Sequence, residues 1–128
     1  MKLCAGVAGA GAMGRNHARV FSLLEGVDLV AIYDRDKALA DSVAAEFGAV
    51  AVDSLDEFAE AVDAATVAVP TIAHREVGCQ LMEKGVHVLM EKPIADSLDD
   101  ARALIETSHR CGKILQVGHI ERFNPVMK

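Results

Sequence analysis

The stretch Lys2–Gly14, KLCAGVAGAGAMG, decides the fold of this chain. Its first part, Lys2–Ala8, is a short and mostly apolar run of the kind that forms a buried strand. Gly9, Gly11 and Gly14 follow at the spacing GxGxxG. In a strand–turn–helix unit the first glycine permits the tight turn, the second lets backbone N–H groups approach a diphosphate, and the third lets the helix lie close to the sheet. Because a glycine turn alone is a weak signal, the flanking sequence has to support this interpretation.

The rest of the chain alternates short apolar runs with helical patterns, which predicts a mostly parallel sheet with helices on both faces. The further strands are expected at Val27–Tyr33, Val50–Val52, Ala65–Val69, Val86–Met90 and Lys113–Val117. Helical stripes of apolar residues start near Met13, Leu39, Leu55, Val77 and Leu98. The predicted fold class is therefore α/β, a doubly wound parallel sheet (Rossmann fold) in a single domain.

Helix boundaries carry their own signals. Ser54 with Glu57, and Ser97 with Asp100, have the spacing of capping boxes. A glycine follows each of four helical stripes, where a left-handed residue can end a helix: Gly26, Gly48, Gly85 and Gly112. The caps and the hydrophobic period therefore predict the same helices.

Composition excludes several classes of protein. The 128 residues include 13 basic and 19 acidic side chains, a net charge of -6, which argues against a nucleic-acid partner. No apolar run approaches the roughly 18 residues of a membrane helix. Cys4, Cys79 and Cys111 lack CxxC spacing, and the histidines lack ligand spacing, so we expect neither disulfides nor a metal site. These features predict a cytoplasmic protein without a membrane partner.

Asp34 supports the dinucleotide interpretation of the glycine loop. It ends the second predicted strand twenty residues after Gly14, where a carboxylate can accept both hydroxyls of an adenosine ribose. The same carboxylate would repel a 2′-phosphate, so we expect NAD in preference to NADP. Arg35 leaves two roles open: stacking on the adenine, or meeting a 2′-phosphate if Asp34 turns away.

Glu91-Lys92-Pro93 lies at the end of the fifth predicted strand. Ligands of open parallel sheets bind outside the carboxyl ends of the strands, so these residues are expected beside a nicotinamide. Oxidation of an alcohol by hydride transfer needs a base for the hydroxyl proton, and a neighbouring pyridinium favours the neutral form of a lysine. Lys92 is therefore the candidate catalytic residue.

Five stretches together resemble the N-terminal domain of the Gfo/Idh/MocA oxidoreductase family. They are GAGAMG at Gly9–Gly14, Asp34, VPTIAH at Val69–His74, HVLMEKP at His87–Pro93, and GHIERFNP at Gly118–Pro125. The resemblance implies an NAD(P)-dependent dehydrogenase acting on a CH–OH group of a sugar, cyclitol or nucleotide sugar. The last stretch is most similar to members that act on UDP-N-acetylhexosamines or their uronates at C3.

The resemblance also implies roles for individual residues. Lys92 would contribute to catalysis, and Thr71, His74, Glu91 and His119 would lie around the cofactor. With the residues of the glycine loop and the second strand, the predicted cofactor-binding set is Gly9, Gly11, Ala12, Met13, Gly14, Asp34, Arg35, Thr71, His74, Glu91, Lys92 and His119.

A substrate domain normally follows in this family and often supplies a homo-oligomer interface. Asn124-Pro125 is typical of a helix start, so we expect a domain boundary here, with 1–122 binding the dinucleotide and 123–128 leading to a substrate domain that is absent from the sequence. The small-molecule substrate would bind through that domain, and turnover by these 128 residues alone is not expected.

Two other classes of protein use a similar first loop. A nucleotide-binding regulatory module would need the glycines but not Lys92. An S-adenosylmethionine-dependent methyltransferase would have no use for Gly14 or for the Glu-Lys-Pro turn. Binding of S-adenosylhomocysteine without NAD would favour the methyltransferase.

Overall fold

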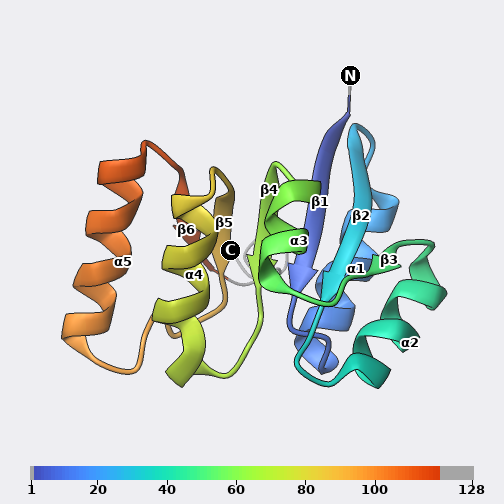
Figure 1. Ribbon diagram of the computed structural model, residues 1–128, viewed down its shortest axis with the longest axis horizontal. Helices are drawn as coiled ribbons and strands as arrows, with labels where there is room; N and C mark the ends of the chain where they lie inside the picture. Colours follow the sequence, from blue (N-terminus) through green and yellow to red (C-terminus); the bar gives the residue numbers. More distant parts are fainter. Residues whose placement is uncertain (1, 119–128) are drawn as a thin grey trace, which may run out of the picture.

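A computed structural model describes residues 2–118. Six strands form one sheet in the order β3-β2-β1-β4-β5-β6, and all neighbouring pairs are parallel (Figure 1). The strands are β1 (Leu3–Ala8), β2 (Val27–Tyr33), β3 (Val50–Ala51), β4 (Ala64–Val67), β5 (His87–Met90) and β6 (Leu115–Val117). The chain runs outward from β1 to β3, then returns to pair β4 with the other side of β1, which is the doubly wound topology predicted from the sequence.

Helices connect successive strands and cover both faces of the sheet. They are α1 (Ala12–Leu23), α2 (Lys37–Phe47), α3 (Leu55–Ala61), the short 3₁₀ helix η1 (Thr71–Ala73), α4 (His74–Glu83) and α5 (Leu98–Cys111). In Figure 1, α4 and α5 lie in front of the sheet and α1 lies behind it. Every predicted helix and strand is present.

Two apolar cores lie on the two faces. On one face Phe58 of α3, Leu81 of α4 and Leu104 of α5 are fully buried against the sheet. On the other face Ala18 of α1 and Val43 of α2 pack in a separate cluster with strand residues. Burial of these side chains on both sides explains why the strands read as continuous apolar runs.

Strand ends differ from the prediction by two residues at two places. β4 ends at Val67 and does not extend to Val69, because its neighbours β1 and β5 end at Ala8 and Met90, the residues that pair with Val67. β6 starts at Leu115 and not at Lys113. The N–H of Lys113 donates to the Ser108 carbonyl at 3.0 Å, so Lys113 belongs to the turn that ends α5.

Both predicted serine caps are formed, and the predicted glycines Gly48 and Gly112 end α2 and α5, but the C-caps of α1 and α4 are Leu24 and Lys84. The Ser54 hydroxyl accepts from the N–H of Glu57, and the Ser97 hydroxyl accepts from the N–H of Asp100, each at 3.1 Å. At the other end, Gly112 after α5 has a left-handed conformation with φ 65°. Side-chain oxygens thus satisfy first-turn donors of α3 and α5, as the capping pattern indicates.

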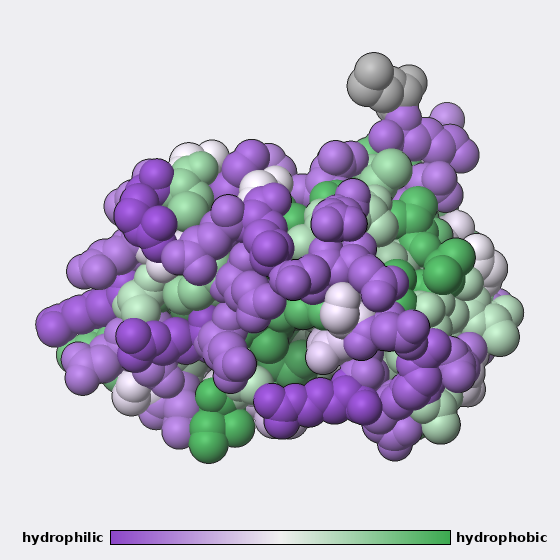
Figure 2. All heavy atoms as spheres, viewed as in Figure 1, coloured by the Kyte–Doolittle hydropathy of each residue, from purple (hydrophilic) through white to green (hydrophobic). Residues whose placement is uncertain are grey.

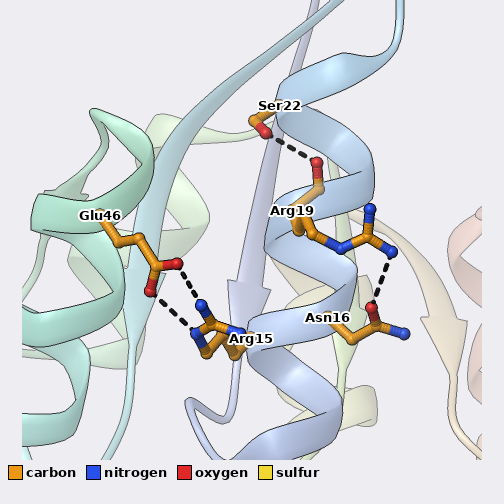
Figure 3. Close-up of polar contacts among 5 residues, drawn as sticks. All are labelled: Arg15, Asn16, Arg19, Ser22 and Glu46. Atoms are coloured by element: carbon orange, nitrogen blue, oxygen red, sulfur yellow. Dashed lines mark hydrogen bonds and ion pairs between the residues drawn. The ribbon is translucent and has the colours of Figure 1, made fainter.

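Polar contacts on the surface tie α1 to α2 (Figure 3). Arg15 donates two hydrogen bonds to the carboxylate of Glu46, one of them 2.8 Å long from Nε. These bonds and the negative charge of Glu46 raise the pKa of the Arg15 guanidinium above its ordinary value. Arg15 directly follows Gly14, so this contact fixes the start of α1 against the second helix.

Within residues 2–118, no helix has the length and apolar character needed to cross a membrane. The predicted domain boundary after residue 122 lies outside the described residues, as do His119 and the Asn124-Pro125 pair.

Candidate functional site

The glycine loop joins the end of β1 to the start of α1, and two of its glycines are required by packing. Gly9 has φ 107°, and a Cβ there would lie 2.5 Å from the backbone of Ala68. A Cβ on Gly14 would lie 1.6 Å from the carbonyl oxygen of Gly9. The loop can therefore turn this tightly, with α1 against the strand ends, only with glycine at both positions.

Gly11 has a different environment, because a Cβ there would meet no protein atom within 4 Å. It is the N-cap of α1 and provides no side-chain cap. The N–H groups of the first turn, at Ala12, Met13 and Gly14, have no acceptor within the helix and carry the positive end of its dipole. Open space in front of uncapped N–H groups suits an anion such as a diphosphate.

Asp34 directly follows β2 and contacts the glycine loop. One carboxylate oxygen accepts from the N–H of Ala10 at 2.7 Å, and the other accepts from the N–H of Asp36 at 2.8 Å. An ionised carboxylate has about four acceptor positions, so each oxygen retains one for an incoming hydroxyl group. The carboxylate is partly buried, and these two bonds fix its orientation.

A cavity of about 510 Å³ adjoins Asp34 on the side of α3 and α4. Its wall combines the end of β2, the loop after β4 and the apolar faces of the two helices: Tyr33, Asp34, Arg35, Asp36, Leu55, Val69, Pro70, Ile72, Ala73, Glu76, Val77 and Gln80. In Figure 2 apolar surface is visible in the depression between α3 and α4, while the outer surfaces of the helices are mostly hydrophilic. An apolar cavity with one fixed carboxylate at its rim can accept an aromatic base attached to a ribose.

A second cavity, of about 160 Å³, lies at the ends of β4 and β5. It is lined by Met13, Ala68, Val69, Pro70, Thr71, His74, Glu91 and Lys92. Val69 and Pro70 line both cavities, so the two are neighbours along the carboxyl edge of the sheet. The structure thus brings together five residues that the sequence predicted for the site: Met13, Thr71, His74, Glu91 and Lys92.

His74 lines this cavity, but its side chain is buried in the wall and is not exposed to the cavity's interior. The side chain is 1% exposed, and its ring nitrogens Nδ1 and Nε2 lie 3.1 and 3.0 Å from the carbonyl oxygens of Ile94 and Val69. Both ring nitrogens are therefore already engaged by backbone. A direct contact between His74 and a cofactor stays a prediction.

His17, buried on the apolar face of α1, contacts Glu91, one of the residues that line the smaller cavity. Its side chain is 2% exposed, its Nε2 is hydrogen-bonded to Glu91 Oε1, and its Nδ1 lies 3.5 Å from the Thr66 hydroxyl. Glu91 is itself only 7% exposed. A histidine on the apolar face of a helix is buried and needs a polar partner, and this rule was the one sign in the sequence that His17 has such a partner. Only the folded structure identifies the partner as Glu91.

The predicted cations and the last predicted histidine differ in what the structure describes of them. Arg35 and Lys92 are exposed at the two cavities, where their side chains can reach a ligand. His119 lies outside the described residues. Among residues 2–118, no group of three or more His, Cys, Asp or Glu side chains is arranged to hold a metal ion.

The sequence of the chain was compared with models of known protein families. A family model described as the Gfo/Idh/MocA oxidoreductase family, NAD-binding Rossmann fold, matches residues 3–119. The chain belongs to this family. The predicted family resemblance and fold class are thereby confirmed.

Relatives within the Gfo/Idh/MocA family are considerably longer. The chain is 40% identical over 124 residues to a 4-carboxy-2-hydroxymuconate-6-semialdehyde dehydrogenase from Sphingobium sp., covering 93% of this chain and 39% of the relative. It is 35% identical over 123 residues to a UDP-N-acetylglucosamine 3-dehydrogenase from Acidithiobacillus ferrooxidans, covering 96% and 39%. The chain therefore spans about two fifths of the length of each.

Solved structures agree with the sequence relatives. A crystal form of the Acidithiobacillus ferrooxidans enzyme superposes with a TM-score of 0.92 at 34% identity, covering 99% of this chain and 41% of the other. The structure of GenD2 from gentamicin A biosynthesis in complex with NAD gives a TM-score of 0.87 at 35% identity, covering 91% and 34%. The chain is thus an NAD-binding Rossmann domain of the Gfo/Idh/MocA family.

Proposed function

We propose that this domain binds NAD along the carboxyl edge of the sheet. The observation that carries the proposal is the continuous series of Gly11, Asp34 and the two neighbouring cavities. The diphosphate would rest on the N–H groups at the start of α1. The adenosine would occupy the larger cavity with its ribose on Asp34, and the nicotinamide would lie at the smaller cavity beside Lys92.

The two hydrogen bonds that orient Asp34 support a preference for NAD over NADP. To let a 2′-phosphate in, the carboxylate would have to turn away from the N–H groups of Ala10 and Asp36 and lose both hydrogen bonds. The N–H of Ala10, a buried residue, would then lose its acceptor, and the phosphate meets like charge if the carboxylate stays. Arg35 can stack on the adenine from its exposed position without any such rearrangement.

In a longer protein we propose that the domain supports oxidation or reduction at a CH–OH group of a sugar, cyclitol or nucleotide sugar. The bound nicotinamide ring would supply the hydride acceptor or donor. Lys92 would hold or move the hydroxyl proton from its exposed position at the smaller cavity. Glu91 also lines this cavity, but its side chain is largely buried and bonded to His17.

For the substrate class, the nucleotide-sugar hypothesis gains support from the Acidithiobacillus ferrooxidans relative, whose name states action on UDP-N-acetylglucosamine at C3. The Sphingobium relative is named for a different substrate at higher identity. A UDP-N-acetylhexosamine is therefore one member of the proposed class, and the choice depends on residues beyond this domain.

Calorimetric titration of the 128-residue chain tests the binding proposal. NAD should bind with 1:1 stoichiometry and NADP should bind at least about tenfold more weakly, a difference of about 1.4 kcal/mol. Equal affinities for NAD and NADP would contradict the role of Asp34. Binding of S-adenosylhomocysteine and not of NAD would overturn the proposal in favour of a methyltransferase.

A further inference from the structure

The segment from Glu91 to Ile94 follows β5 and carries Lys92, and a buried histidine holds it near each end. At the start, His17 of α1 bonds to the Glu91 carboxylate. At the end, His74 of α4 bonds to the Ile94 carbonyl. The two histidines come from helices that cover opposite faces of the sheet, so the segment is fixed from both sides.

The bond between His17 and Glu91 links the glycine loop to the Lys92 segment. His17 lies three residues after Gly14 on α1, and Glu91 directly precedes Lys92. An ionised carboxylate can only accept, so Nε2 of His17 carries the hydrogen, and Nδ1 can then accept from the Thr66 hydroxyl. Because both side chains are buried, a charge-assisted hydrogen bond between them is stronger than it would be in water.

His74 links the same segment to the loop after β4. Its two ring nitrogens face the carbonyl oxygens of Val69 and Ile94, and carbonyl oxygens only accept. The bond to Ile94, which bears on the Lys92 segment, therefore forms when Nδ1 of His74 carries the hydrogen. Val69 lines both cavities, so this bridge joins the wall of the candidate cofactor site to the segment that carries Lys92.

We propose that His17 and His74 are positioning residues for Lys92. The inference rests on the proposed function, because the proposed function places Lys92 beside the nicotinamide. An exposed lysine has a flexible four-carbon side chain, so its reach is defined only if its backbone is fixed. The bonds to Glu91 and Ile94 provide that fixed base, and neither histidine needs to touch the cofactor.

The test follows the Lys92 side chain directly in the 128-residue chain by NMR of ¹³C-dimethylated lysines. The Lys92 signal is the one absent from Lys92→Arg, and NAD should shift it in the wild type. In His17→Leu, which fills the space without a polar atom, NAD affinity should fall by no more than about fivefold, because the diphosphate and adenosine contacts are elsewhere. The shift of the Lys92 signal on NAD addition should nevertheless be lost.

Conservative and control variants separate positioning from general stability. His17→Gln places an amide N–H near the position of Nε2 and should restore the response of the Lys92 signal. His109→Leu changes an exposed histidine near the end of α5 and should leave both NAD affinity and the response unchanged. A fully retained response in His17→Leu would overturn the inference while leaving the proposed function intact.

Two outcomes bear on the proposed function instead. If NAD does not bind the wild type, the cofactor proposal fails; if it binds without moving the Lys92 signal, the assignment of Lys92 fails and the positioning inference with it. Imidazole ¹⁵N spectra of the wild type decide the inference even if His17→Leu does not fold. They should show hydrogen on Nε2 of His17 and on Nδ1 of His74, the nitrogens that face the Glu91 carboxylate and the Ile94 carbonyl, and hydrogen absent from either would refute it.

Discussion

The carboxylate of Asp34 accepts a hydrogen bond from the backbone N–H of Ala10 at 2.7 Å, which ties the end of β2 to the glycine loop. One side chain thus organises the loop and keeps acceptor positions for a ligand. Its second oxygen holds the N–H of Asp36, the residue that caps α2. Any change at Asp34 therefore affects both the loop and the start of the next helix.

Replacing Asp34 by alanine should weaken NAD binding by about 10- to 100-fold, because the ribose hydroxyls lose a charged acceptor and the loop loses its bond to β2. The affinity for NADP should fall less, because the negative charge that repels its 2′-phosphate is removed. The difference between the affinities for NAD and NADP should therefore become smaller. Calorimetry measures both. Asp28→Ala, at an exposed position near the other end of β2, is the matched control and should change neither affinity.

Alanine should destabilise the fold far more at Gly14 than at Gly11. Gly14→Ala should cost about 3 kcal/mol or more of unfolding free energy, because its Cβ would overlap the Gly9 carbonyl. Gly11→Ala should cost only about 1 kcal/mol, the usual difference at an N-cap. Gly11→Ala should nevertheless lower the affinity for NAD about tenfold or more, because the added Cβ would occupy the space of the diphosphate. Urea unfolding and calorimetry measure the two quantities, and unchanged NAD affinity in Gly11→Ala would refute the placement of the diphosphate.

Replacing Lys92 by methionine should leave NAD affinity of this chain within about threefold of the wild-type value, because the side chain is exposed beyond the diphosphate and adenosine contacts. In the longer protein with its substrate domain, we expect turnover to fall by about 10²- to 10⁴-fold, the usual contribution of a group that moves a proton. Steady-state kinetics checks this. An unchanged kcat would remove Lys92 from the reaction.

The Ser97→Ala variant should lower the free energy of unfolding by about 1 kcal/mol, because α5 loses the hydroxyl that accepts from the N–H of Asp100. Ser42→Ala, at an exposed position inside α2, is the control and should change stability by less than about 0.5 kcal/mol. Thermal or urea unfolding measures both. Equal effects of the two substitutions would show that the Ser97 cap does not stabilise α5.

Strand and helix positions followed from the sequence because local rules act within a few residues. The apolar runs, the serine caps and the glycines after helices each specify structure through nearby backbone, as Ser54 and Gly112 show. The end of β4 and the start of β6 were less well predicted, because the neighbours of β4 end opposite Val67 and the bond from Lys113 to Ser108 competes with strand pairing.

The sequence by itself determined the fold class, the glycine loop and Asp34 at the end of β2, because each depends on residue type at short, fixed spacing. Only the tertiary structure decided the partners of His17, Glu91 and His74. His17 and Glu91 are 74 residues apart, and only folding of the sheet brings α1 against the end of β5. A buried polar group requires a partner, but the spacing of residues along a chain does not identify a partner that distant.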